Sequence, residues 1–291
     1  MSYDLYFMPP AGTRFDAPRF AALFADRAHY EVAGLETFYQ NPDTGVYFSF
    51  DYAEGDPEDE DERFARPYVG FSVNLYRPDY FVLEAAAELA ALIGDRFEVI
   101  DDQVDGIAGE RFDAAQFVAG WRKANAVAYR AMSEHGTIPD AVLSRARNEA
   151  AWRWNHGRAA LQAALGEAVF VPMLMFFAGQ DGQAQRGFVW TTDVPTIVPD
   201  AADVAIVNDY PRRGLLARLA GKRGAAEIAG LVPCAGVMPL TTAHHGQRLL
   251  ALDPDRDRAR IDAALAQLRP ATERLAADAV LDADTPTGAI H

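Results

Sequence analysis

Hydrophobic and polar residues alternate in four short stretches near the start of the chain. These stretches are rich in aromatic residues, as half-buried β-strands are, and they lie at 3–8, 46–52, 69–75 and 97–100. Apolar residues at helical spacing follow Asp16 and also occupy 80–93. Asp16 is a typical N-cap residue, and Gly94 is the residue type that commonly ends a helix. The pattern therefore predicts the element order β-α-β-β-α-β.

This order is that of a split β-α-β sandwich, in which two helices cover one face of a small antiparallel sheet. The rest of the chain is mixed. The spacing predicts helices at 113–128, 139–165, 258–268 and 273–280, and strands at 169–177, 187–192, 196–199 and 204–207. We expect an α+β fold with a β-α-β-β-α-β domain over residues 1–103, followed over 104–291 by helices and a mixed α+β domain.

Composition and cysteine usage indicate a folded protein from a reducing compartment. The chain has 291 residues, of which 50% are hydrophobic, so it can bury a sizeable core. Its one cysteine, Cys234, rules out an internal disulfide framework. The segment Met1–Phe7 lacks the basic stretch of a secretory signal, and the longest apolar stretch, 168–178, is shorter than the roughly 20 residues of a membrane span. We expect a cytoplasmic protein with no membrane partner.

The charge balance narrows the class of partner. Acidic residues number 42 against 27 basic ones, which gives a net charge of −15. A field of that sign repels nucleic-acid backbones and anionic membranes, and it attracts basic proteins. We therefore expect no nucleic-acid binding. The simpler interpretation of this net charge is that it serves solubility alone.

The acidity is concentrated in one segment, Asp51–Glu62, which we call the acidic loop. Gly55 and Pro57 make a strand or a helix implausible there. The carboxylates do not follow the register of a calcium-binding loop, and nothing in the segment sets up an acid–base pair. The loop is either a solvated connection or a docking surface for a basic protein partner. The predicted partner-binding residues are Asp56, Glu58, Asp59, Glu60, Asp61 and Glu62.

The second half holds the residues that an enzyme or a small-ligand binder would use. The candidate pocket residues are Trp152, His156, Cys234, His244 and His245. Trp152 and His156 share a helix face, as packing between domains or a ligand pocket would require. Cys234 could act as a nucleophile with one of the histidines as its base, although free cysteines are commonly buried. Adjacent histidines on a strand point to opposite faces, so they cannot bind one metal together.

Two further segments only partly match known binding motifs, one for calcium and one for phosphate, so we expect neither a metal nor a cofactor. The segment 253–264 resembles a calcium loop, but Arg258 stands in place of its turn glycine and Ala264 in place of its closing glutamate. The glycine spacing in 214–223 is too long for a phosphate loop. Five basic residues lie in this segment or directly before it, and they form either a solvated helix face or a site for an acidic ligand: Arg212, Arg213, Arg218, Lys222 and Arg223.

Two aromatic segments suggest a family. The segments Ser2–Phe7 and Asn41–Phe48 together resemble the opening of bacterial immunity-type proteins, which are encoded beside polymorphic or contact-delivered toxins. The resemblance implies a protein that binds a cognate toxin and blocks its active site without chemistry of its own, and it assigns no residue a role. A protein-binding module is the leading hypothesis. An enzyme or small-ligand binder with a pocket in the second half is the alternative, and a structural subunit of a larger assembly is the third; the oligomeric state is left open.

Overall fold

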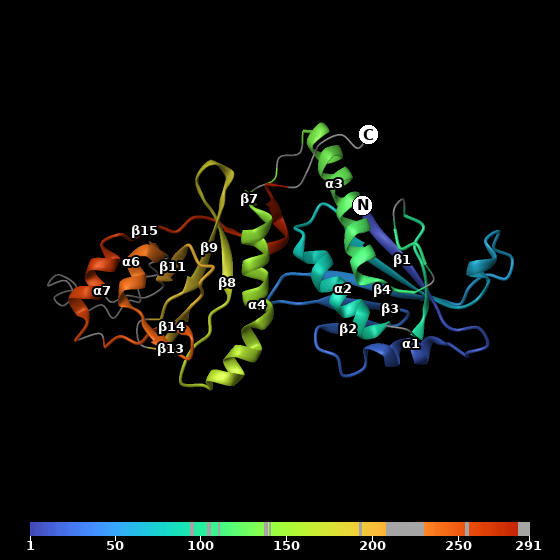
Figure 1. The fold of residues 1–291 in the computed structure, drawn as a ribbon, viewed down its shortest axis with the longest axis horizontal. Coiled ribbons are helices and arrows are strands. Elements are labelled where there is room, and N and C mark those ends of the chain that lie inside the picture. The colour runs from blue at the N-terminus through green and yellow to red at the C-terminus, as the bar shows by residue number, and fades with distance from the viewer. Residues whose placement is uncertain are drawn as a thin grey trace. The chain divides into compact units, whose positions relative to one another are not determined.

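The chain forms two compact units of mixed helix and strand. The computed structural model describes residues 1–93, 96–103, 106–109, 111–136, 139, 141–191, 194–207, 230–253 and 256–284. One unit comprises Met1–Pro139 with Leu281–His291, and the other comprises Asp140–Val280. Helices and several sheets occur in the chain, so the predicted α+β class is confirmed (Figure 1).

The first unit is built on a six-stranded sheet in the order β2-β3-β4-β5-β1-β6, in which every neighbouring pair is antiparallel. Its strands are β1 (Ser2–Met8), β2 (Tyr30–Ala33), β3 (Glu36–Gln40), β4 (Tyr47–Ala53), β5 (Tyr68–Asn74) and β6 (Glu98–Ile100). Its helices are α1 (Ala17–Phe24), α2 (Tyr80–Leu92) and α3 (Ala114–Glu134), with a short 3₁₀ turn, η1 (Glu62–Ala65). Because β1 pairs antiparallel with both β5 and β6, those two strands are parallel. The β5–α2–β6 crossover is therefore a split β-α-β unit.

The β2–β3 hairpin is an element that the sequence pattern did not predict. A two-residue connection, Gly34–Leu35, joins its strands, and Gly34 takes the left-handed φ of 70° that glycine tolerates best. Every residue from Glu31 to Glu36 is exposed, so β2 shows no alternation of buried and exposed positions. Alternation was the signal used for β1, β4 and β5. β2 lacks it, and β3, which alternates over only five residues, was not predicted either.

The core of the first unit lies between the sheet and its three helices. Alternate residues of β1, β4 and β5, such as Leu5, Phe50 and Phe71, are buried. The Phe50 ring lies 5.0 Å from that of Phe24 in α1, and the Phe71 ring lies 5.9 Å from that of Phe117 in α3. The helices thus cover one face of the sheet. The intervening strand residues are half-buried or exposed, and we call the surface they form the open face.

A buried carboxylate fastens α2 to the turn between β3 and β4. Glu84 of α2 is fully buried. Its Oε1 accepts hydrogen bonds from the Tyr39 hydroxyl at 2.7 Å, the Asn41 Nδ2 at 2.8 Å and the Thr44 Oγ1 at 3.1 Å. Such donors offset the cost of removing the carboxylate from water. Two of these donors, Asn41 and Thr44, belong to the turn before β4, so their hydrogen bonds to Glu84 also hold that turn in place.

The division between units falls after Pro139, whereas the sequence pattern placed a boundary between residues 103 and 104. The reason is the packing of α3. Phe117 of α3 contacts Tyr3 at a ring separation of 5.6 Å, and Arg122 forms an ion pair with the buried Asp79 at 2.6 Å. The helix therefore completes the first core. A strand count cannot reveal which core a following helix joins.

The second unit contains a six-stranded mixed sheet, β15-β12-β11-β9-β8-β16, in which only β9 and β11 pair in parallel among the described strands. A three-stranded sheet, β10-β14-β13, accompanies it. The strands are β7 (Ala141–Leu143), β8 (Leu174–Ala178), β9 (Ala184–Val189), β10 (Thr196–Val198), β11 (Val204–Val207), β12 (Gly230–Pro233), β13 (Thr242–His244), β14 (Gln247–Leu250), β15 (Arg269–Pro270) and β16 (Arg274–Leu275). The strand β17 (Val280–Asp282) begins with the last residue of this unit, and its other two residues belong to the first unit. The helices are α4 (Arg145–Leu165), α6 (Cys234–Val237) and α7 (Arg258–Leu265), with 3₁₀ turns η3 (Gln180–Gly182), η4 (Met238–Leu240) and η5 (Ala277–Ala279).

The second unit differs from the predicted pattern at its end. The helix expected over 273–280 is wrong, because β16, η5 and the start of β17 occupy that stretch. Arg274 and Leu275 pair with β8, so tertiary pairing overrides the helical spacing of a short segment. Elsewhere α4 is tied to β8 by Asn155, whose side chain exchanges two hydrogen bonds with the backbone of Leu174 at 2.8 and 2.9 Å.

Candidate functional site

The open face of the first unit presents polar and acidic side chains in cross-strand rows. One row crosses five strands and consists of Asp4, Ser72, Ser49, Phe38 and Glu31. Side chains opposite one another in an antiparallel sheet are close enough to interact. Phe38 is 46% exposed, which is unusual for a large apolar side chain on a sheet surface. The row thus combines two carboxylates with hydroxyl groups and an exposed ring.

The next row carries more negative charge. It consists of Tyr6, Gly70, Asp51, Glu36 and Ala33. The Asp51 carboxylate lies directly over Gly70, where a Cβ atom would overlap it. Desolvation by burial, followed by repulsion from Glu36 and Asp4, raises the pKa of Asp51. Three carboxylates of like charge therefore face the same part of the open face.

These carboxylates lack a cationic partner among the residues that the structure describes. Within the described part of the chain, none of Asp4, Glu31, Glu36 and Asp51 is in an ion pair with lysine or arginine. A cation supplied from outside would offset their mutual repulsion.

A groove of about 540 Å³ runs along the open face from β2 to β5. Phe38, Gln40, Ser49, Ser72 and Asn74 contribute to its lining, together with Glu31. These side chains offer neutral donors and acceptors, one carboxylate and one exposed ring. At the end of the groove the Tyr47 hydroxyl accepts hydrogen bonds from the Arg77 guanidinium, at 3.0 Å from Nε and 2.6 Å from Nη2. The groove has the size of a binding site for a small molecule or a segment of chain.

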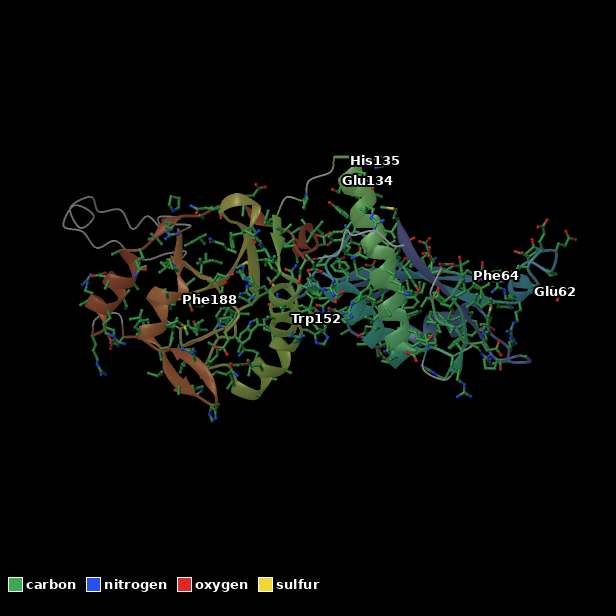
Figure 2. The ribbon with its side chains drawn as sticks, turned by 45° about the horizontal axis from the view of Figure 1, so that its top comes forward. Glu62, Phe64, Glu134, His135, Trp152 and Phe188 are labelled. Atoms are coloured by element: carbon green, nitrogen blue, oxygen red, sulfur yellow. The ribbon has the colours of Figure 1, made fainter. Side chains whose placement is uncertain are left out.

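The acidic loop continues the open face at the far ends of β4 and β5. Asp51–Ala53 belong to β4 and Glu62 begins η1, and the residues between them connect β4 to η1 and project beyond the strands (Figures 1 and 2). The ring of Phe64, which follows the loop in η1, lies 5.0 Å from that of Tyr6 and 5.1 Å from that of Tyr68. Both tyrosines are open-face residues, so Phe64 joins the loop to that face.

Carboxylate turns shape the acidic loop. The Asp56 Oδ1 accepts from the Glu58 amide at 2.9 Å, and the Asp59 Oδ1 accepts from the Asp61 amide at 2.8 Å. Arg63 forms ion pairs with Asp61 at 2.6 Å and with Asp102 at 3.0 Å, and its hydrogen bonds lower the pKa of Asp61. Among the predicted partner-binding residues, Asp61 is therefore compensated within the chain. The others are exposed: Asp56, Glu58, Asp59, Glu60 and Glu62.

The pocket residues predicted in the second half fall on different elements. Trp152 and His156 pack against each other on α4 with ring centroids 5.5 Å apart, and Figure 2 labels Trp152 on that helix. His244 and His245 form a second ring pair, 4.5 Å apart, at the turn between β13 and β14. No cluster of three or more His, Cys, Asp or Glu side chains suited to a metal ion occurs in the described residues. Whether these residues share a pocket stays a prediction.

Cys234 is a buried thiol at the start of α6. It belongs to the core of the second unit, and its amide donates to the Asp203 carbonyl at 2.9 Å. Burial first, and then the Asp203 carboxylate, raises the pKa of Cys234 to about 12. A thiol with that pKa is protonated at neutral pH, whereas a nucleophilic cysteine is a thiolate. The environment of Cys234 thus opposes the role that the enzyme hypothesis gives it. The basic residues Arg212, Arg213, Arg218, Lys222 and Arg223 lie outside the described residues.

Sequence reasoning placed the binding residues in the acidic loop and missed the open face. The available signal was the polar half of each alternating strand, for example Asp4 and Tyr6 in β1. The strand order and register, which bring Asp4, Glu36 and Asp51 together, could not be read from that alternation.

The comparisons with known proteins leave the family open. No protein-family model matches the chain, and searches of curated proteins and of solved structures find no significant match. No helix among the described residues is both long and apolar enough to cross a membrane.

Proposed function

We propose that this chain is a protein-binding module of the immunity type, which engages a basic toxin through the open face and the acidic loop. The observation that carries the proposal is the group of like charges on adjacent strands. Asp4, Glu36 and Asp51 repel one another, and among the described residues none of the three is in an ion pair. Binding of a basic protein relieves that repulsion and speeds the encounter of the two molecules.

The β2–β3 hairpin at the edge of this surface supplies apolar contact area, with Phe38 on the open face and Val32 on the other side of β2. Phe38 is 46% exposed, and Val32 and Leu35 in the same hairpin are 41% and 50% exposed. Stable protein interfaces have an apolar centre with aromatic anchors inside a polar rim. The hairpin provides the anchors, and the carboxylates of the open face and of the acidic loop provide the rim.

Blocking, rather than catalysis, is the activity that these groups support. The groove offers hydroxyl and amide groups, and the acidic loop beyond Ala53 exposes the carboxylates of Asp56, Glu58, Asp59 and Glu60 to open solvent, which is a poor setting for a general acid or base. An immunity protein needs only to cover the active site of its toxin. The aromatic likeness of Ser2–Phe7 and Asn41–Phe48 to immunity-type proteins favours the same conclusion.

The test uses the product of the reading frame adjacent to the gene of this chain. We expect that product to arrest growth when expressed alone and to be neutralised by co-expression of the chain. In the purified complex, the triple variant Glu58→Lys/Asp59→Lys/Glu60→Lys should slow association about tenfold or more at low salt, with the difference shrinking as salt screens the charges.

A matched control separates local charge from net charge. Glu134, Glu167 and Glu273 are exposed residues outside the proposed surface, and their replacement by lysine changes the net charge by the same amount. We expect this variant to associate almost as fast as the wild type. Equal slowing by both triple variants would show that only net charge matters. Failure of the adjacent product to bind would refute the immunity proposal.

A further inference from the structure

β2 is an edge strand whose outward backbone groups face away from the sheet. It pairs only with β3 among the described strands, in the register Glu31 to Phe38 and Ala33 to Glu36. The Gln40 amide donates to the His29 carbonyl at 2.9 Å, which fixes the phase of the ladder. Hydrogen-bonded pairs alternate with non-bonded ones in an antiparallel ladder. The N–H and C=O of Val32 therefore point away from β3, toward the edge.

This edge has only some of the devices that usually protect one. Natural edge strands are very short, carry charged residues (lysine above all) or proline, or are bulged or covered, and β2 is short, with four residues, and carries Glu31. The stretch from Glu31 to Glu36 contains neither lysine nor proline, and all of it is exposed. It carries apolar side chains instead, with Val32 and Leu35 both exposed by 41% or more. At the opposite edge, in contrast, Glu98 of β6 is held by an ion pair with Arg66.

The charge next to the edge selects the kind of segment that would fit. Glu31 lies on the open face beside Phe38, and Glu36 follows on β3. The groove begins at this edge, since Glu31, Ala33 and Phe38 all line it. In a strand laid beside β2, residues on the open side would meet the Glu31 carboxylate and the Phe38 ring. Arginine and lysine interact favourably with both. Residues on the other side would meet Val32, which favours apolar side chains.

We propose that β2 accepts an extended basic segment of the partner as a seventh strand of the sheet. This inference rests on the proposed protein-binding function and names how the partner docks. Main-chain hydrogen bonds to Val32 give the segment its register. Arginine or lysine at alternate positions faces Glu31 and the groove, and apolar residues at the intervening positions face Val32.

The experiment uses the full chain and two synthetic peptides with blocked ends. One peptide alternates arginine and valine over eight residues, and the other alternates glutamate and valine. We expect the arginine peptide to bind and to slow hydrogen exchange of the Val32 amide, measured by NMR, by about tenfold or more. The glutamate peptide should leave that amide unchanged.

Single substitutions at Val32 separate the backbone contact from the side chain. Val32→Pro removes the outward N–H but no bond of the β2–β3 ladder, and proline is tolerated at such edge positions. Val32→Ala keeps the N–H and is the matched control. We expect Val32→Pro to weaken binding of the arginine peptide about tenfold, Val32→Ala about twofold, and Glu31→Gln severalfold.

Exchange of the Val32 amide that the arginine peptide does not slow in the wild-type chain, or equal binding by the Val32→Pro and Val32→Ala variants, would overturn the inference. The amide measurement needs no variant, so it decides the matter even if Val32→Pro unfolds. The proposed function fails separately. If the adjacent gene product still binds in a way that depends on Glu58, Asp59 and Glu60, then the module binds proteins without adding a strand at β2.

Discussion

Two carboxylates of the first unit, those of Glu84 and Asp51, lie in opposite environments. Glu84 is buried and surrounded by three donors, so its charge organises the turn before β4. Asp51 is more open, and its neighbours on the sheet are also acidic. The first arrangement stabilises the fold. The second costs some stability, and the proposed partner would recover it on binding.

Replacing Glu84 tests the first arrangement. Glu84→Ala strands the Tyr39, Asn41 and Thr44 donors in the core, so we expect the free energy of unfolding to fall by about 3–5 kcal/mol. Glu84→Gln keeps an acceptor oxygen and should cost less. Glu88→Ala is the control, since that half-buried residue accepts one hydrogen bond, from Tyr30 at 2.9 Å. Denaturant unfolding measures all three, and equal losses for Glu84→Ala and Glu88→Ala would contradict this account.

The pH dependence of Asp51→Asn tests the second arrangement. The pKa of Asp51 is raised in the folded state, so the folded state holds this proton more tightly than the unfolded state. The stability contributed by the proton is present below the ordinary aspartate pKa and is lost as pH rises through the raised value. We therefore expect Asp51→Asn to stabilise the chain at neutral pH, by about 0.5 kcal/mol as for other like-charge cross-strand pairs. Near pH 3 the gain should vanish in denaturant unfolding curves; a gain that does not change with pH would contradict the charge argument.

At the scale of elements, the sequence pattern predicted strands that alternate over six or seven residues and strands that are apolar throughout, and it missed the short hairpin β2–β3. β1, β4 and β5 bury every second residue and were predicted close to their observed bounds. β2 is exposed on both sides and was missed. Residues 54–61 of the acidic loop form a connection, as Gly55 and Pro57 indicated, whereas Asp51–Ala53 continue β4 and Glu62 begins η1. Its link to the open face depends on Phe64 meeting Tyr6 and Tyr68, and such contacts follow from tertiary packing rather than from local pattern.

Phe64→Ala tests whether this ring holds the acidic loop against the open face. The Asp56 amide donates to the Phe64 carbonyl at 3.0 Å, so the loop closes on the residue whose ring is anchored. Without the ring, we expect faster hydrogen exchange at the Asp56 amide and a loss of about 1–2 kcal/mol of local stability. Phe64→Tyr should preserve both. Unchanged exchange in the alanine variant would show that the loop holds its shape by its carboxylate turns alone.

At the scale of the whole molecule, α3 decides where the first unit ends. The sequence pattern showed a helix at this place but could not assign it to a core, because an apolar stripe fits any sheet that offers a matching face. The structure assigns it through Phe117, which is fully buried against Tyr3 and Phe71.

Phe117→Ala should therefore weaken the first unit and leave the second intact. We expect a loss of about 3–5 kcal/mol, as for other buried phenylalanines replaced by alanine. Hydrogen exchange should accelerate at the amides of β1 and β5 and stay unchanged at those of β9 and β11. Val127→Ala is the control, because Val127 is on the same helix and 48% exposed. Faster exchange in both units would show that the two unfold as one.

The first unit is discontinuous, and this sets an order for its assembly during translation. Its early part ends at Pro139, and its late part begins at Leu281. The Asp282 carboxylate accepts from the Asp79 amide at 2.7 Å, and the Asp282 amide donates to the Tyr129 hydroxyl at 3.2 Å. On the ribosome, every residue of the second unit is synthesised before Asp282 appears. The nascent first unit must wait for these contacts, so the unit whose synthesis begins first cannot finish folding until the whole of the second unit has been synthesised.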